Sequence, residues 1–176
     1  GAKTCFWHHG MLYIDQEQNV DSIKPVLYAT GCAAVYRKSM LDELGGFDEA
    51  YSPFYREDAD LGYRAWKRGW RSVYQPASSV YHQHSASISK VGRGFVDTIK
   101  ARNAFFFIWR NIEDAVLIRR HQKWLPLVIA KNMLMGNRHL WLGYRLACKE
   151  ANWCVRARQN DSLHRKLSDR DIFKEI

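Results

Sequence analysis

Apolar residues recur along this chain in two patterns, as short runs in its first half and as longer helical stripes in its second. The short runs, which favour β-strands, cover residues 11–14, 26–30, 70–75 and 79–82. Two helices are expected among them, over residues 38–44 and 58–68. Each is followed by glycine, the residue that most readily takes the left-handed conformation at a helix end.

From residue 95 onward the apolar spacing is helical almost throughout. It predicts helices over residues 95–109, 113–122, 125–135 and 140–158. Ser168 and Asp171 have the spacing of a capping box, which predicts one last short helix. The predicted fold class is α/β, with a short mixed sheet within residues 1–86 and a mostly helical region over residues 87–176.

The charge of the chain is divided unevenly between these two regions. Residues 1–86 hold nine Lys and Arg against ten Asp and Glu, whereas residues 87–176 hold eighteen against eight. This basic excess predicts an anionic partner for the second region. Nucleic acid is not the expected partner, because no helix-turn-helix spacing, zinc-knuckle pattern or aromatic RNA-binding strand accompanies the charge.

Cysteine usage and hydropathy bear on the compartment. The four cysteines form no CxxC pair, which is typical of reduced thiols in a cytosolic protein. No signal peptide opens the sequence, and no apolar run approaches the roughly 18 residues that span a bilayer. We therefore expect a cytoplasmic protein.

The most informative stretch of the chain is residues 54–70, where Glu57, Asp58 and Asp60 open a predicted helix. Like charges this close cost folding energy unless a metal, a proton or a cation uses them. A carboxylate at a rigid helix start, beside an aromatic loop, suits a general base for a sugar hydroxyl. The structural alternative is that Asp58 caps the helix and Asp60 pairs with Arg64, four residues on.

Two histidines follow in the sequence, His82 and His84. A neutral imidazole at position 82 suits a divalent metal ion. The alternative is a packed, hydrogen-bonded histidine.

Five segments, taken in order and spacing, resemble the second half of the family 2 glycosyltransferases of the GT-A fold. These segments are residues 30–38, 45–48, 57–64, 67–70 and 80–82. The nearest resemblance is to bacterial rhamnosyltransferase-like and galactofuranosyltransferase-like enzymes. The resemblance implies that the fold is the C-terminal, acceptor-side half of a GT-A domain followed by a basic helical tail.

The resemblance also implies roles for single residues. Asp58 matches the catalytic base of an inverting, single-displacement transfer, and Glu57, with Tyr55 and Trp70, is assigned to acceptor binding. His82 matches a histidine that completes the metal site, with His84 as the second choice. The residues assigned to the scaffold are Asp60, Arg64, Gly31, Gly45, Gly46 and Gly69.

Members of that family also have an N-terminal Rossmann-like half that binds the nucleotide and supplies an Asp-x-Asp metal motif. This sequence shows neither a long βαβ run nor an acidic pair at a strand end. We therefore expect the chain to be inactive alone. Mg²⁺ or Mn²⁺, the nucleotide-sugar donor and a glycan or lipid-linked acceptor are expected to bind together once a donor-binding half is present, for example from another subunit or a homo-oligomer.

In the basic second region, Lys and Arg alternate with Trp and aliphatic residues. This pattern is typical of an interfacial membrane helix, and an ordinary helical bundle with a basic surface is the alternative. The resemblance favours peripheral association with the anionic inner face of a bacterial cell membrane, where cell-surface polysaccharide precursors are extended. Two functions remain: the acceptor-side part of a glycosyltransferase, or a non-catalytic scaffold module that docks through its basic tail.

Overall fold

The structure is a computed structural model that describes residues 1–81 and 91–176. It begins with an antiparallel hairpin of β1 (Ala2–His8) and β2 (Met11–Glu17), in which Phe6 lies opposite Tyr13. A second antiparallel pair joins β3 (Lys24–Pro25) to β4 (Val73–Tyr74). Both sheets are antiparallel, so the predicted mixed sheet is wrong, whereas the α/β class is confirmed.

Two helices and two 3₁₀ turns lie between β3 and β4. They are η1 (Gly31–Ala33), α1 (Lys38–Leu44), η2 (Glu49–Tyr51) and α2 (Glu57–Lys67). Both predicted helices are confirmed to within a residue. Gly45 ends α1 at φ 73°, and Gly69 follows α2 at φ 87°, which is the left-handed conformation that glycine favours.

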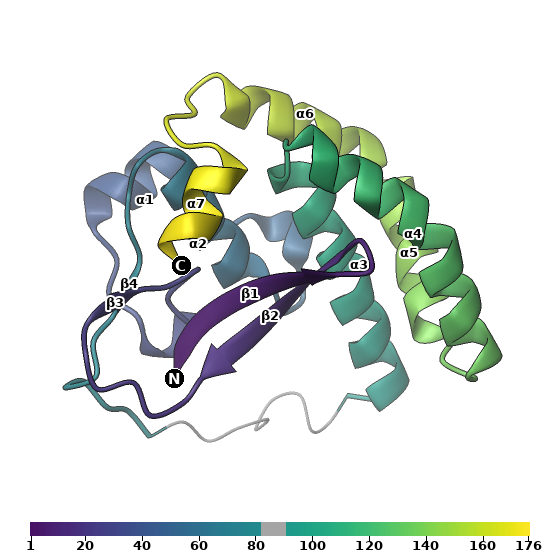
Figure 1. Ribbon diagram of the computed structural model, residues 1–176, viewed down its shortest axis with the longest axis horizontal. Coiled ribbons are helices and arrows are strands. Elements are labelled where there is room, and N and C mark those ends of the chain that lie inside the picture. The colour runs from purple at the N-terminus through teal and green to yellow at the C-terminus, as the bar shows by residue number, and fades with distance from the viewer. Residues whose placement is uncertain (82–90) are drawn as a thin grey trace.

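The rest of the described chain is helical. It forms α3 (Arg93–Asn111), α4 (Ala115–Leu134), α5 (His139–Lys149), α6 (Ala151–Ser162) and α7 (Asp169–Glu175). Figure 1 shows the β1–β2 hairpin in front of α3, with α4 and α5 side by side to the right and α7 next to α2. Among the described residues, no helix combines the length and the apolar character needed to cross a bilayer.

Helix α3 is the centre of the core. Residues 105–108 are all buried, and consecutive helical positions point about 100° apart, so this part of α3 is enclosed on every side. Phe105 contacts Tyr144 of α5, Phe106 contacts Trp153 of α6 and Phe107 contacts Tyr63 of α2, each with ring centroids 5.3–5.5 Å apart. Residues from both sides of the expected boundary at 86 and 87 therefore share one core.

Three helix predictions are wrong in their boundaries. The expected helices over 113–122 and 125–135 are one helix, α4, which continues through Pro126. The single helix expected over 140–158 is divided at Glu150 into α5 and α6. Turning there lets α6 as well as α5 pack against α3. The final helix and its Ser168–Asp171 capping box are confirmed.

The strand predictions were less accurate. The first strand, β1, was not predicted. In the predicted strand over residues 26–30, the Val26 amide donates to Ser72 O at 3.0 Å and the Leu27 amide to Lys3 O at 2.8 Å, and the residues after them belong to neither sheet. The strand predicted over 70–75 is reduced to two residues, and 79–81 form no strand. All four cysteines are free thiols, and burial raises the pKa of Cys5 and Cys154 to about 12.

Candidate functional site

The acidic start of α2 is set by a strained turn directly before it. Tyr55 and Arg56 both have positive φ angles, 70° and 77°, which non-glycine residues rarely adopt. Arg56 is the N-cap residue and makes no side-chain capping bond. The structural alternative in which Asp58 caps the helix is therefore wrong, and its carboxylate is available for other contacts.

Helix α3 holds the loop that carries this turn. The Asn103 side-chain amide is buried and donates to the carbonyls of Tyr51, Phe54 and Tyr55 at 2.8–2.9 Å. Arg102 donates to the Ser52 carbonyl. Because these contacts fix the loop from several points, they offset the backbone strain at positions 55 and 56.

Asp60 is fully buried and fully bonded. Its carboxylate accepts from Arg64 Nε at 2.7 Å, from Tyr51 Oη at 2.9 Å and from Asn111 Nδ2 at 2.8 Å, and Arg110 Nη1 lies 3.5 Å away. The expected pair with Arg64 is thus present. The hydrogen-bond acceptor positions of the Asp60 carboxylate are therefore occupied by protein donors, and none is left for a substrate. This agrees with the expected place of Asp60 in the scaffold.

Arg64 extends this network to the turn after α1. Its guanidinium donates to the carbonyls of Leu44 and Gly46, both at 2.8 Å. Gly45 and Gly46 both have φ 73°, so the chain can turn there and present these carbonyls. Arg64, Gly45 and Gly46 together fix α1 against α2.

Asp58 has a different environment from Asp60. Its oxygens accept from the backbone amides of Ala59 at 2.8 Å and Gly31 at 3.3 Å. Burial raises the pKa of the Asp58 carboxyl, although those amides and the charge of Lys3 act in the opposite direction. Among the residues that the structure describes, Asp58 forms no ion pair, whereas the buried Asp60 and Asp169 do.

Glu57 is the second acid in this position. Burial, together with the charge of Asp58, raises the pKa of the Glu57 carboxyl. Its Oε2 atom is buried and makes no hydrogen bond to any described residue. Glu57 and Asp58 are therefore two partly buried carboxyls at one helix end, both held as stronger bases than an exposed acid.

Two tyrosines complete the surroundings of these carboxyls. Burial and the charges of Asp58 and Glu57 raise the pKa of Tyr36 to about 12 and raise that of Tyr28 further, so both hydroxyls keep their protons. The Tyr36 hydroxyl donates to the Ala29 carbonyl at 3.0 Å. Sequence reasoning missed Tyr28, Tyr36, Lys3 and Arg56. Tyr28, Tyr36 and Lys3 approach Asp58 from segments far away in the sequence, for which the sequence gives no clear signal.

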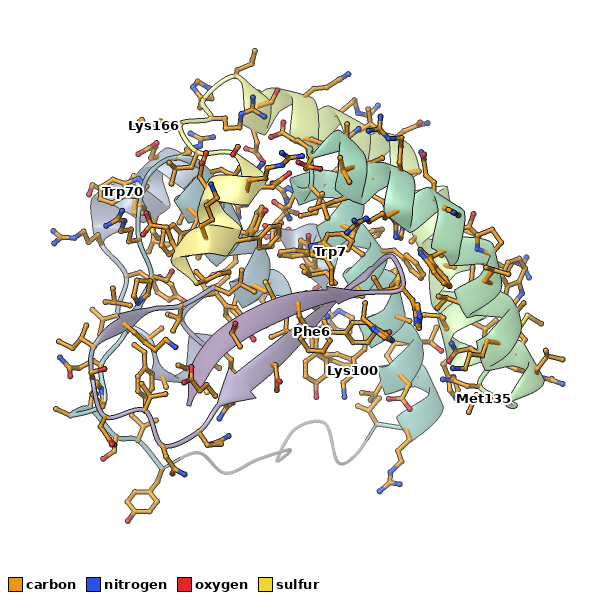
Figure 2. The ribbon with its side chains drawn as sticks, viewed as in Figure 1. Phe6, Trp7, Trp70, Lys100, Met135 and Lys166 are labelled. Atoms are coloured by element: carbon orange, nitrogen blue, oxygen red, sulfur yellow. The ribbon has the colours of Figure 1, made fainter. Side chains whose placement is uncertain are left out.

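The residues assigned to acceptor binding are not all brought together. The Tyr55 ring belongs to the turn and helix start at residues 55–60, called the acidic turn below. Lys100 Nζ lies over this ring, 4.6 Å from its centroid. Trp70 lies beyond the other end of α2, which rises roughly 14 Å from Asp58 to its last residue, Lys67. Its indole donates to Glu43 at 2.8 Å and packs against α1, so in this structure it serves that contact. Figure 2 shows Trp70 well away from Lys100, the neighbour of the Tyr55 ring.

The two histidines predicted as metal ligands lie outside the residues that the structure describes. His82 and His84 lie in the segment 82–90, which is not described. Among the residues described, no three His, Cys, Asp or Glu side chains come together as metal ligands. Mg²⁺ is usually held by one or two carboxylates together with waters and substrate phosphates, so Asp58 and Glu57 by themselves do not define a metal site.

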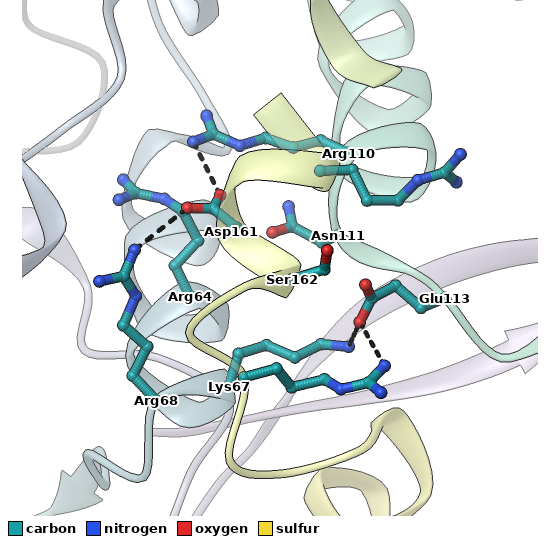
Figure 3. Close-up of a pocket in the computed structure, with 10 residues that line it drawn as sticks. Arg64, Lys67, Arg68, Arg110, Asn111, Glu113, Asp161 and Ser162 are labelled. Atoms are coloured by element: carbon teal, nitrogen blue, oxygen red, sulfur yellow. Dashed lines mark hydrogen bonds and ion pairs between the residues drawn. The ribbon is translucent and has the colours of Figure 1, made fainter. Parts of the chain in front are cut away.

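A basic hollow lies at the other end of α2, between α2, α3 and α6 (Figure 3). Its volume is about 20 Å³, room for a single water molecule. Arg68 and Arg110 both reach Asp161, at 3.4 and 3.3 Å, while Lys67 and Arg165 share Glu113. Each of these four cations has an acid partner, and Arg158 donates to the Ile112 carbonyl at 3.5 Å, so the hollow is an ion-pair network that ties α6 to α2 and α3.

Known proteins resemble the part of the chain that contains the acidic turn. Residues 12–96 match a family model described as glycosyltransferase like family 2. An N-acetylglucosaminyl-diphospho-decaprenol L-rhamnosyltransferase of Mycobacterium tuberculosis is 36% identical over 109 residues, 62% of this chain and 32% of that protein. A pre-mycofactocin glycosyltransferase of the same organism is 33% identical over 111 residues, 63% of this chain and 21% of that protein.

The chain therefore spans about a third of the first relative and about a fifth of the second. No solved structure matches it. The matched residues include β2, α1, α2 and the start of α3, and with them every residue of the acidic turn. Residues 12–96, just under half of the chain, are therefore similar to the family 2 glycosyltransferases.

Proposed function

We propose that this chain is the acceptor-side part of an inverting GT-A glycosyltransferase. It would transfer a sugar from a nucleotide-sugar donor to a glycan or lipid-linked acceptor, in the synthesis of a cell-surface polysaccharide. The observation that carries the proposal is Asp58, a partly buried carboxylate with a raised pKa and no ion-pair partner among the described residues. A carboxylate in that state is a stronger base than an exposed aspartate.

In the proposed reaction, Asp58 accepts the proton of one acceptor hydroxyl. The hydroxyl oxygen then bonds to the anomeric carbon of the donor sugar as the bond from that carbon to the nucleotide phosphate breaks. A single displacement of this kind inverts the configuration at the anomeric carbon. Gly31 N, which donates to Asp58 at 3.3 Å, holds the carboxylate in position.

Glu57 and Tyr55 are the proposed acceptor contacts beside this base. The buried, unbonded Oε2 of Glu57 is a hydrogen-bond acceptor without a described donor, and a sugar hydroxyl would supply one. The Tyr55 ring offers an apolar face of the kind that packs against a sugar. Trp70 is not included, because it contacts α1 at the far end of α2.

The donor and any metal need residues beyond this site. No three candidate metal ligands come together among the described residues, and no step of the proposed reaction is assigned to a metal. We propose that Mg²⁺ or Mn²⁺ binds together with a donor-binding half, with His82 as a ligand from this chain. The relative's name states that it acts on a decaprenol-linked sugar, which supports a lipid-linked acceptor at the inner face of the membrane.

Reconstitution tests this function. The chain alone, given nucleotide-sugar, acceptor and Mg²⁺ or Mn²⁺, is expected to transfer no sugar. The same chain joined to the donor-binding half of its rhamnosyltransferase relative is expected to transfer it with inversion, followed by product mass and by NMR of the new linkage. Transfer by the chain alone would refute the need for a second half. A folded, donor-binding fusion that never transfers would favour the scaffold alternative.

A further inference from the structure

The outward face of α4 combines cations with apolar side chains and has no acid. At 100° per residue, three basic residues lie within about 60° of Leu127 on that face, Arg120, Lys123 and Lys131. The apolar residues that share it are Val116, Trp124, Leu127, Ala130 and Leu134. All of them are exposed, and Leu127 reaches 60%. The opposite face, with His121 and Ile129, is buried against the rest of the protein.

The turn from α4 to α5 extends this surface with an apolar tip. Met133, Leu134 and Met135 are 46%, 89% and 74% exposed. Gly136 follows at φ 79°, and the turn leads into Arg138 and α5. Figure 2 shows Met135 at the end of the molecule farthest from Trp70.

The charge around this surface has one sign only. Residues 115–149, which cover α4, the turn and α5, contain seven Lys and Arg and no Asp or Glu. A water-facing helix pair ordinarily mixes both signs, and exposed aliphatic and Met side chains are uncommon at a bare tip. The combination of cations, one Trp and protruding apolar side chains is complementary to an anionic lipid surface.

We propose that the α4–α5 hairpin, residues 115–149, docks on an anionic lipid bilayer and inserts the Met133–Leu134–Met135 tip into it. The outward face of α4 then lies along the interface, with its apolar residues about 5–10 Å into the headgroup boundary. Arg120, Lys123 and Lys131 meet lipid phosphates there. Nucleic acid fits less well, because it would use the cations and leave the protruding aliphatic tip in water. This proposal does not rest on the transferase function.

Vesicle flotation with the full chain tests it. Binding is expected to vesicles of phosphatidylcholine with phosphatidylglycerol, to weaken as salt is raised, and to be much weaker on phosphatidylcholine alone. K123E/K131E is expected to lower the partition coefficient by at least roughly tenfold, given about 1 kcal/mol per basic residue near an anionic surface. Lys38→Glu makes half of that charge change on exposed α1, on the opposite side of the molecule, and is expected to have little effect.

The tip is tested separately. L134S/M135S is expected to weaken vesicle binding roughly tenfold or more through lost apolar burial. Leu163→Ser removes an equally exposed leucine after α6, 79% exposed, and serves as its control. Circular dichroism and thermal unfolding show that each variant is folded. The proposal would be overturned by equal binding to neutral and anionic vesicles, or by binding to neither. It would also be overturned if the chain bound duplex DNA but no vesicles, and if this DNA binding were salt-sensitive and abolished by K123E/K131E.

Discussion

The three carboxylates that open α2 differ in what surrounds them. Asp60 is buried among Arg64, Tyr51, Asn111 and Arg110, while Asp58 contacts backbone amides and Glu57 keeps one buried oxygen unbonded. Ion pairing stabilises the charge of Asp60, whereas burial is the main cause of the raised pKa values of Glu57 and Asp58. Of the three carboxylates, only those of Glu57 and Asp58 have hydrogen-bonding capacity left for a substrate.

Replacing Asp60 is expected to damage the fold. In Asp60→Asn, Arg64 and Arg110 lose a buried charge partner, and breaking such a pair costs about 3–5 kcal/mol in the free energy of unfolding. Asp42→Asn is the matched control, because its partner Lys38 is exposed and such pairs contribute at most about 1 kcal/mol. Urea unfolding measures both. A similar, small loss for the two variants would contradict the structural role of Asp60.

His121 is expected to make stability depend on pH. It accepts from Trp109 Nε1 at 3.0 Å and bonds the Gly10 carbonyl at 2.7 Å, and burial lowers its pKa. The unfolded chain, with a pKa of about 6.5, therefore binds the proton more tightly than the folded one. The stability from neutral His121 is complete above about pH 6.5 and is lost as the pH falls below it.

The check is the free energy of unfolding between acidic and neutral pH. His121→Gln is expected to flatten the loss on the acidic side of about pH 6.5, because residue 121 then no longer titrates. His164→Gln, which removes an exposed histidine after α6, is expected to leave the slope unchanged. An unchanged slope in His121→Gln would show that His121 is not held neutral by the fold.

At the residue scale, the sequence predicted contacts that lie close along the chain. Asp60 and Arg64 are four residues apart on one helix, so their pairing could be expected from spacing alone. Asn111 and Arg110, which also reach Asp60, come from α3 some fifty residues later. Tyr28 and Tyr36 beside Asp58 were missed for the same reason, since their approach depends on tertiary packing.

At the scale of elements, the position of α2 depends on close packing of Gly62 against Leu27 and Tyr28, in the segment that precedes η1. A Cβ atom added at Gly62 would lie 2.4 Å from Tyr28 Cβ and 3.0 Å from the Leu27 carbonyl oxygen. The absence of a side chain at Gly62 therefore lets α2 lie directly on Leu27 and Tyr28. That contact also brings Gly31 within reach of Asp58.

Gly62→Ala is expected to destabilise the protein by about 1–3 kcal/mol, the usual cost of an added methyl in a packed contact. Gly92→Ala is the control, since no atom lies within 4 Å of a Cβ there. Gly92 is the N-cap residue of α3, where alanine is less favourable than glycine, so its cost is expected to be about 1 kcal/mol or less. Chemical unfolding gives both values. A Gly62→Ala protein as stable as the Gly92→Ala protein would contradict the packing of α2 on Tyr28.

The sequence predicted elements well where local signals agreed and poorly where packing decided. Glycine-terminated α1 and α2 and the capped α7 were predicted, because their end signals lie within the elements. Separate helices were expected over residues 113–122 and 125–135, but α4 is continuous and includes Pro126 on its exposed side. The two-residue strands β3 and β4 are too short to leave a periodic signal.

At the scale of the whole molecule, α7 ties the end of the described chain back to α2. Asp169 is buried and accepts from Tyr63 Oη at 2.6 Å and from the amides of Glu113 and Asp114, with Lys67 Nζ 2.6 Å away. The basic helical region and the acidic turn thus form one packed unit. A membrane-docked α4–α5 hairpin would hold the acidic turn near that membrane, where the proposed lipid-linked acceptor would lie.

The rate of sugar transfer with Asp58→Asn, in a chain joined to a donor-binding half, tests the central claim most directly. Asparagine keeps the size of the side chain and an oxygen for the Gly31 amide but cannot take up the acceptor proton. We expect transfer to fall by at least roughly a hundredfold, the usual effect of losing a general base, with folding and donor binding unchanged. Asp42→Asn is expected to transfer at the normal rate. A folded Asp58→Asn enzyme that transfers sugar as fast as its Asp42→Asn control would contradict Asp58 as the base.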